Sequence, residues 1–242
     1  MLMSHQPLTV LAGLLLWTAC TAAPEQSILR IAISPSAQPV SDAILACAQT
    51  SGEVFTTIDI LYSATFEVAE YDFFIRLGEP DEDMEAILPL ANERVSVALN
   101  NSLSLGSVNR SALVEILTGR IRDWSELGGP EEPITIWVGP ESDDARGIIE
   151  EGLLRGAPIV GNAHIASNPS ALLNAVANEI GSIGILPAAW ADDRVEIIDV
   201  EIEAPVLAIS TNELRPEARE LLACLQGTTG QAVLSERYTL ID

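Results

Sequence analysis

The sequence predicts an α/β fold, and three observations support this prediction. Short apolar runs of strand length alternate with longer runs whose apolar residues recur at helical spacing. Breaks rich in Ser, Pro, Gly or Asn separate these runs. Hydrophobic residues make up 48% of the 242 residues, which is enough for a sizeable core and argues against disorder. Repeated strand–helix alternation favours mostly parallel sheets covered by helices.

The predicted elements follow one another along almost the whole chain. The predicted strands are 27–34, 55–63, 71–78, a segment within 86–101, 134–139, 181–187, 195–200 and 204–211. The predicted helices are 39–49, 111–119, 144–154, 169–179, 216–226 and 228–238, with a helical turn near 65–70. The polar stretch near 100–110 is the best internal boundary.

The charge of the chain excludes one class of partner. The formal net charge is −23, and every basic residue is Arg. Binding of nucleic acid needs clustered positive charge to neutralise phosphates, so we expect no nucleic-acid partner. An acidic surface keeps a protein soluble. It does not decide the charge of a ligand, because a cleft can differ from the surface.

The N-terminal residues predict export. Residues 8–17 form an apolar run that is too short for a comfortable membrane span. Thr18-Ala19-Cys20 follows and resembles a bacterial lipoprotein signal, in which Cys20 is lipidated and becomes the first mature residue. We therefore expect a signal segment at 1–20 and a linker at 21–27. A plain secretory signal or an N-terminal anchor is the alternative, and each of these exports the protein.

Two cysteines remain after the signal segment, and they are candidates for a disulfide. Cys47 and Cys224 both lie in helix-like runs, and a pair of cysteines in an exported protein can be bridged. If the two helices are neighbours, the bridge ties the start of the mature chain to its end. Two buried, unpaired thiols are the alternative. We expect no metal site and no cofactor, because His164 stands alone and neither cysteine has a His nearby.

Residues 88–129 carry a specific resemblance to a known family. The segment LPLANERVSVALNNSLSLGSVNRSALVEILTGRIRDWSELGG is similar to the middle of the phosphate-binding kind of type II periplasmic solute-binding protein. Residues 179–190, EIGSIGILPAAW, resemble a later strand of the same family, and the pattern covers roughly residues 28–240. The matching positions of the first segment are Ile116, Leu117, Gly119, Ile121, Trp124, Leu127, Gly128 and Gly129.

The resemblance implies two α/β lobes joined by two crossing strands, with a ligand bound in the cleft between them. One lobe would hold 28–97 plus 191–242 and the other 98–190, and the lobes would close around the ligand by a hinge. Cys47 and Cys224 both fall in the first lobe, which agrees with a bridge between them.

Trp124 is expected to have a structural role in this fold. Gly119 can end the preceding helix in a left-handed conformation, and Ile121 and Trp124 would then pack over the helix end. A ligand-stacking role for Trp124 is the alternative.

The first two expected ligand loops carry hydroxyl groups. In the family an oxyanion is held by hydroxyls, by an Arg and by backbone N–H groups at helix N-termini, where unpaired donors and the helix dipole favour negative charge. Ser34 and Ser36 follow the first strand and match the first ligand loop, and Ser63 matches the second. A helix cap for the first pair and a turn role for Ser63 are the alternatives.

The third and fourth loops depart from the family pattern. Where the phosphate binders carry a cleft Asp, this chain has Leu77, and Arg76 enters beside it as a candidate to hold an anion. A salt bridge at the surface or between the lobes is the alternative role for Arg76. Gly139 stands at the position of the family's Arg. Asp143 and Asp144 stand at the next ligand positions, and we include Asp143 with Ser142 among the expected ligand-binding residues. A role of the two carboxylates as caps of the following helix is the alternative. These changes put phosphate specificity in doubt, because fold does not determine function.

The sequence therefore predicts an exported, lipid-anchored solute-binding protein of an ABC-type importer, with a small anionic solute, a permease and the membrane as partners. The alternative is a degenerate family member that acts as a structural or signalling lipoprotein. A cation held by Glu141, Asp143 and Asp144 is a second possibility for the ligand. We expect no enzyme and no catalytic residues, because the chain has no Gly-x-Ser-x-Gly elbow and only one His after the signal segment.

Overall fold

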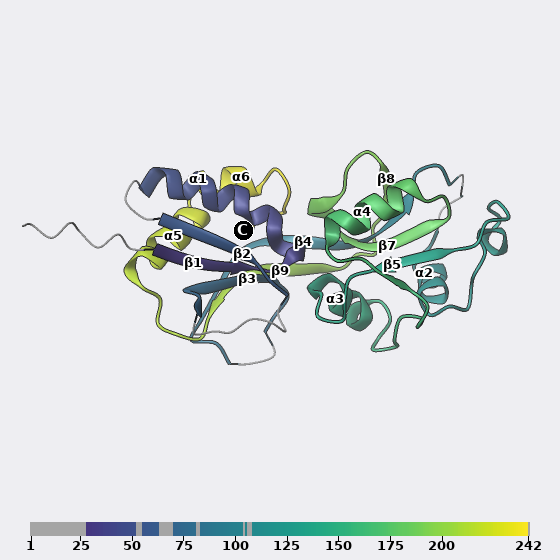
Figure 1. The fold of residues 1–242 in the computed structure, drawn as a ribbon, viewed down its shortest axis with the longest axis horizontal. Helices are drawn as coiled ribbons and strands as arrows, with labels where there is room; N and C mark the ends of the chain where they lie inside the picture. Colours follow the sequence, from purple (N-terminus) through teal and green to yellow (C-terminus); the bar gives the residue numbers. More distant parts are fainter. Residues whose placement is uncertain are drawn as a thin grey trace, which may run out of the picture.

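A computed structural model of the protein describes residues 28–51, 55–62, 70–80, 83–103, 105 and 108–241. Figure 1 shows two groups of helices and strands side by side, which long strands connect. The strands are β1 (Ile28–Ile33), β2 (Phe55–Ile60), β3 (Phe73–Leu77), β4 (Ala86–Asn100), β5 (Thr135–Val138), β6 (His164–Ile165), β7 (Ser182–Pro187), β8 (Val195–Ile198) and β9 (Glu203–Ser210). The helices are α1 (Ser41–Ser51), α2 (Arg110–Leu117), α3 (Asp144–Gly152), α4 (Pro169–Asn178), α5 (Pro216–Gln226) and α6 (Thr228–Leu234), with short 3-10 turns η1 (Pro35–Val40), η4 (Trp124–Leu127) and η5 (Ala188–Trp190).

The strands pair in one continuous order, β2-β1-β3-β9-β4-β7-β5-β6, and β8 is added to β4. At one end β1 pairs in parallel with β2 and β3, and at the other end β5 pairs in parallel with β6 and β7. The middle of the sheet is antiparallel, since β9 runs against both β3 and β4, and β4 runs against β7. The expectation of mostly parallel sheets was wrong for this middle part. The chain leaves the first group along β4 and returns along β9 in the opposite direction, so these strands cannot be parallel.

Strand β4 runs through both groups of helices and strands and connects them. Its first part, Ala86–Arg94, pairs with β9, and its second part pairs with β7 and β8. We call the elements around β1, β3 and β9 the first group and those around β5 and β7 the second group (Figure 1). The lobe limits proposed above remain a prediction. Strand pairing would place residues 195–198 with the second group, because β8 pairs with Val97–Asn100.

Helices α1, α5 and α6 pack together in the first group. Cys47 on α1 and Cys224 on α5 form a disulfide with a Cα–Cα distance of 5.8 Å. The predicted bridge is therefore present, and it joins positions 177 residues apart in the sequence. The neighbouring helices explain it, since two cysteines on packed helices can reach bonding distance.

The segment around Trp124 has the structural role that the sequence predicts. Gly119 follows α2 with a φ of 77°, a left-handed conformation that favours glycine. Asp123 caps η4, and its capping box with Glu126 fixes the turn that begins at Trp124. The Trp124 side chain is completely buried, and its Nε1–H donates a hydrogen bond of 2.9 Å to the carbonyl oxygen of Gly181. Trp124 thus links η4 to Gly181, the residue before β7.

Several sequence predictions fall outside the described residues. These are the signal segment at 1–20 with Cys20, the linker at 21–27, Ser63 and most of the helical turn near 65–70. In the part of the chain that the structure describes, no helix is long and apolar enough to cross a membrane.

Candidate functional site

The candidate site lies between the end of β3 in the first group and the start of α3 in the second. A cavity of about 760 Å³ separates these elements. The return segment before β9 forms a further wall of the same cavity. The lining residues are Arg76–Pro80, Glu141–Asp144, Gly147, Ile148, Glu151, Gly152 and Ile202–Pro205.

A hydrogen bond between Ser36 and Asp143 connects the two groups beside this cavity. Ser36 lies in η1, which β1 leads into, and its Oγ–H donates to Oδ2 of Asp143 at 2.9 Å. Asp143 is the N-cap of α3, and its Oδ1 accepts from the backbone N–H of Arg146 at 3.0 Å. One carboxylate therefore caps a helix of the second group and binds a hydroxyl of the first group.

Gly139 makes room for this carboxylate. A Cβ atom built at Gly139 would lie 2.6 Å from the Cβ and Cγ atoms of Asp143, which is too close for any side chain. The glycine at 139 and the carboxylate at 143 are therefore sterically matched in this chain.

Asp144 makes the second set of contacts across the groups. Its Oδ2 accepts a hydrogen bond of 3.1 Å from the backbone N–H of Leu77, at the end of β3. Its Oδ1 lies 3.6 Å from Nη2 of Arg76, and both side chains are largely buried. Arg76 therefore forms the interlobe salt bridge that was the alternative to anion binding, although it also lines the cavity.

The remaining predicted site residues have different surroundings. Ser34 is buried, and its Oγ has no hydrogen-bond partner among the described residues. It is the N-cap of η1 but makes no side-chain cap bond, so the alternative capping role is not fulfilled. Ser142 lines the cavity, and Ser63 lies outside the described residues.

The structure also brings two residues to the site that sequence reasoning missed. The Tyr62 hydroxyl donates a hydrogen bond of 2.7 Å to the carbonyl oxygen of Ser167, which again joins the first group to the second. Burial, followed by the nearby charges of Asp143 and Asp144, raises the pKa of Tyr62 to about 12. Trp190 donates through Nε1 to the carbonyl oxygen of Ser36 at 3.2 Å. Both residues stand beside quoted motif positions, but nothing in their spacing indicated a contact across the groups.

Comparison with known proteins places this arrangement in a known architecture. No family model matches the chain. Over 159 residues the chain is 29% identical to the phosphate-binding protein PstS of Bacillus subtilis, which corresponds to 61% of this chain and 49% of that protein. The chain thus spans about half the length of the curated relative that it matches.

Two solved structures share the fold. One is a proposed phosphate ABC transporter substrate-binding protein with bound phosphate from Clostridium perfringens, with a TM-score of 0.79 and 18% identity over 89% of this chain and 100% of that one. The other is an ABC-type phosphate transport receptor from Vibrio cholerae, with a TM-score of 0.70 and 17% identity over 88% and 100% of the two chains. This chain has a PstS-like, type II periplasmic-binding-protein fold.

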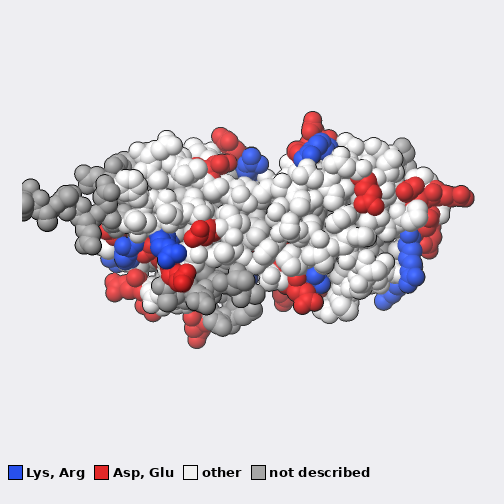
Figure 2. Space-filling model, viewed as in Figure 1, with Lys and Arg blue, Asp and Glu red and all other residues white. Residues whose placement is uncertain are grey.

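Acidic side chains dominate the cleft of this periplasmic-binding-protein fold. Figure 2 shows that both groups carry acidic side chains on the face in view and that the surface narrows between them. Arg76 is the only basic residue among the described residues that line the 760 Å³ cavity, and it faces Asp144. The carboxylates of the lining are Glu79, Glu141, Asp143, Asp144, Glu151 and Glu203. An anion that enters this cleft must therefore compete with the chain's own carboxylates for the same donors.

Replacement of Asp143 with Asn is expected to stabilise the protein at neutral pH by about 3 kcal/mol. Burial raises the pKa of Asp143 to about 6, from an ordinary value of 3.8. At pH values between 3.8 and about 6, the Asp143 carboxyl group keeps its proton in the folded state but has lost it in the unfolded state. The free energy of unfolding of the wild type therefore falls as the pH rises through this window. The substituted amide would still cap α3 and would carry no buried charge. The gain should therefore appear between about pH 4 and pH 6 and level off above that window.

The measurement is urea unfolding of both proteins across this pH range. Glu141→Gln is the matched control, because Glu141 lines the same cavity but is exposed. It should change stability little at any pH. A difference between wild type and Asp143→Asn that does not vary with pH would contradict the assignment of a buried, titrating carboxyl to this position.

Proposed function

We propose that this protein is an exported, lipid-anchored solute-binding protein of an ABC-type importer, and that it binds a small solute in the cavity between β3 and α3. The observation that carries the proposal is the 760 Å³ cavity, which both groups and the return segment before β9 line together. In a two-lobed fold, such a position lets a ligand touch both lobes and favour their closure about the crossing strands. The likeness to PstS and to phosphate transport receptors supports the same role.

Export and anchoring rest on the N-terminal sequence. The apolar run at 8–17 and Cys20 support a lipid anchor at the outer face of the membrane. The permease partner is proposed because the names of the similar proteins refer to ABC-type transport. These relatives are binding proteins by name, which supports a role in binding rather than catalysis.

We propose a small anion as the solute, with Arg76 as the principal cation. The backbone N–H of Leu77, the next residue, is a further donor. The Ser34 hydroxyl, which the family resemblance assigns to the first ligand loop, is buried and has no partner among the described residues. Binding would require the Asp144 carboxylate to leave Leu77 and Arg76, since an anion needs the same donors. The affinity for phosphate should therefore be lower than that of a cleft whose donors are free.

A thermal unfolding assay with a ligand panel tests this proposal. The panel contains phosphate, sulfate, molybdate, small carboxylates, amines and divalent cations at matched ionic strength. A solute present at about 100 times its dissociation constant should stabilise the folded protein by roughly 2.7 kcal/mol. Arg76→Ala should abolish the effect of an anion, whereas Arg120→Ala should not, because Arg120 is exposed and pairs with Glu115. Stabilisation by cations alone would contradict the proposal of an anionic solute. It would assign the site to Glu141, Asp143 and Asp144.

One observation favours a second candidate function, that of a degenerate family member acting as a structural or signalling lipoprotein. Asp143 and Asp144 already bind the hydroxyl of Ser36 and the N–H of Leu77, so the chain's own oxygens satisfy donors that a solute would need. Closure of the two groups then requires no ligand. This candidate predicts that no member of the panel changes the unfolding temperature.

A further inference from the structure

Glu93 is a buried acidic residue on the crossing strand β4, away from the cavity described above. Its exposed fraction is 1%. It stands where the strand partner of β4 changes, since Glu93 pairs with Ala204 of β9 and Val95 already pairs with Pro187 of β7. A group at this position touches the connection between the two halves of the molecule.

One oxygen of the Glu93 carboxyl group lacks a partner among the described residues. Oε1 accepts a hydrogen bond of 3.3 Å from the backbone N–H of Ala189, in the turn after β7. Oε2 is buried and accepts no hydrogen bond from any residue that the structure describes. A buried carboxylate oxygen without a donor costs free energy, because water has been removed and nothing replaces its hydrogen bonds.

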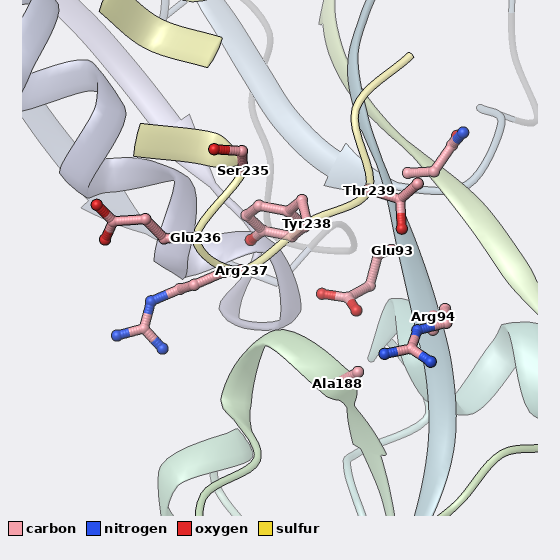
Figure 3. Close-up of a pocket in the computed structure, with 9 residues that line it drawn as sticks. Glu93, Arg94, Ala188, Ser235, Glu236, Arg237, Tyr238 and Thr239 are labelled. Atoms are coloured by element: carbon pink, nitrogen blue, oxygen red, sulfur yellow. The ribbon is translucent and has the colours of Figure 1, made fainter. Parts of the chain in front are cut away.

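Glu93 is one of the residues that line a small polar cavity of about 230 Å³. Figure 3 shows the Glu93 carboxyl group directed into the space between Tyr238, Arg237 and Ala188. The walls come from three places in the sequence, namely β4, the turn after β7 and the C-terminal segment. The lining residues are Asn92, Glu93, Arg94, Ala188 and Ser235–Thr239.

The basic residues around this cavity are engaged elsewhere. Arg94 lies 3.5 Å from the carboxylate of Asp199, and Arg237 donates through Nη1 to the carbonyl oxygen of Ala189 at 3.0 Å. Neither guanidinium forms an ion pair with Glu93 among the described residues. The other titratable groups facing this region are Glu236 at the rim and Tyr238, whose hydroxyl donates to the carbonyl oxygen of Ala37. The negative charge of Asp42 on α1 contributes to the raised pKa of Tyr238.

We propose that this cavity is a binding site for a small protonated amine, whose ammonium group donates hydrogen bonds to Oε2 of Glu93. An ammonium group supplies the missing donor and a compensating positive charge together. The ring of Tyr238 lies beside Glu93 and offers an aromatic surface that attracts cations. A hard metal ion fits less well, since it requires several oxygen ligands and the cavity presents few carboxylates. The volume admits only a ligand of a few heavy atoms.

Binding at this site is coupled to release of a proton. Burial raises the pKa of Glu93 to about 8, so the carboxyl group is mostly protonated at neutral pH. The amine binds the ionised form, and the carboxyl proton passes to solvent as the ammonium group takes its place. The bound amine would lie against β4, the turn after β7 and the C-terminal segment, which together form the walls of the cavity.

Isothermal titration calorimetry with ethylammonium chloride tests the proposal. Titrations of the wild-type chain near pH 7 in two buffers of different ionisation enthalpy measure the protons released. We expect close to one proton per bound amine, since the carboxyl group is mostly protonated at this pH. Glu93→Gln, which keeps the shape but carries no charge, should weaken binding by about tenfold or more. Glu220→Gln is the matched control, because Glu220 on α5 is exposed and does not line this cavity, and it should leave affinity within about twofold.

Three results would overturn the proposal. The first is the absence of binding heat at millimolar amine. The second is equal affinity of wild type and Glu93→Gln. The third is equal binding of tetramethylammonium, which has the charge but no N–H donor. The proton count comes from the wild-type chain alone, so it remains decisive even if the variant folds poorly.

Discussion

Replacement of both Cys47 and Cys224 with Ala is expected to lower the free energy of unfolding by about 3–5 kcal/mol. The disulfide closes a loop of 177 residues, so it removes much of the conformational freedom of the unfolded chain. It also holds α1 against α5 in the first group, where Cys47 is fully buried. Urea unfolding of the oxidised wild type and the double variant measures the difference.

Reduction of the wild type provides the matched control for this prediction. The reduced wild type and the double variant should unfold at similar urea concentrations, because both lack the cross-link and keep small side chains at the two positions. The oxidised wild type should unfold at a clearly higher concentration. Equal midpoints for all three samples, or two titratable thiols in the protein as isolated from an oxidising compartment, would contradict the bridge.

Replacement of Trp124 with Ala is expected to destabilise the protein by about 3–5 kcal/mol. The change removes the largest fully buried side chain among the described residues and leaves a cavity between η4 and Gly181. It also removes one of two donors to the carbonyl oxygen of Gly181, which keeps the backbone N–H of Thr135. Chemical denaturation followed by circular dichroism would measure the loss.

Phenylalanine at the same position separates packing from hydrogen bonding. Trp124→Phe keeps an aromatic ring but loses the Nε1–H donor, so the loss should be smaller than for Ala. Trp137→Phe is the matched control, because the Trp137 indole is only half-buried and donates to an exposed carboxylate of Glu179. That change should cost less than about 1 kcal/mol. If Trp124→Ala left stability intact but abolished solute binding, Trp124 would belong to the ligand site instead.

Much of the fold could be predicted from sequence pattern. The run 181–187 appears as β7 at 182–187, and the run 216–226 appears as α5 with the same limits. The last helix was predicted to reach 238 but ends at Leu234, where the chain turns toward the pairing of Thr239 with Asn92. Periodicity identifies an element because it depends on neighbouring residues. It carries no information about strand direction, which explains the wrong expectation for the middle of the sheet.

The candidate site could be predicted only in part. Ser36, Arg76 and Asp143 do lie near one cleft, as the resemblance implied. The sequence left open whether Arg76 holds an anion or forms an ion pair, and the structure places it 3.6 Å from Asp144. Glu93 escaped notice because an acidic residue within a strand pattern looks like a solvent-facing position.

The sequence by itself determined the α/β class, the family resemblance and the structural role of Trp124, and its charge leads us to expect no nucleic-acid partner. These depend on composition and on contacts between residues close in the chain or within one recognisable motif. Only the tertiary structure decided that Asp143 and Asp144 bind donors of the opposite group, that Cys47 and Cys224 are bonded, and that Glu93 is buried beside a polar cavity. Such facts depend on contacts between residues about 70 to more than 170 positions apart, and no local pattern in the chain records which distant groups will meet.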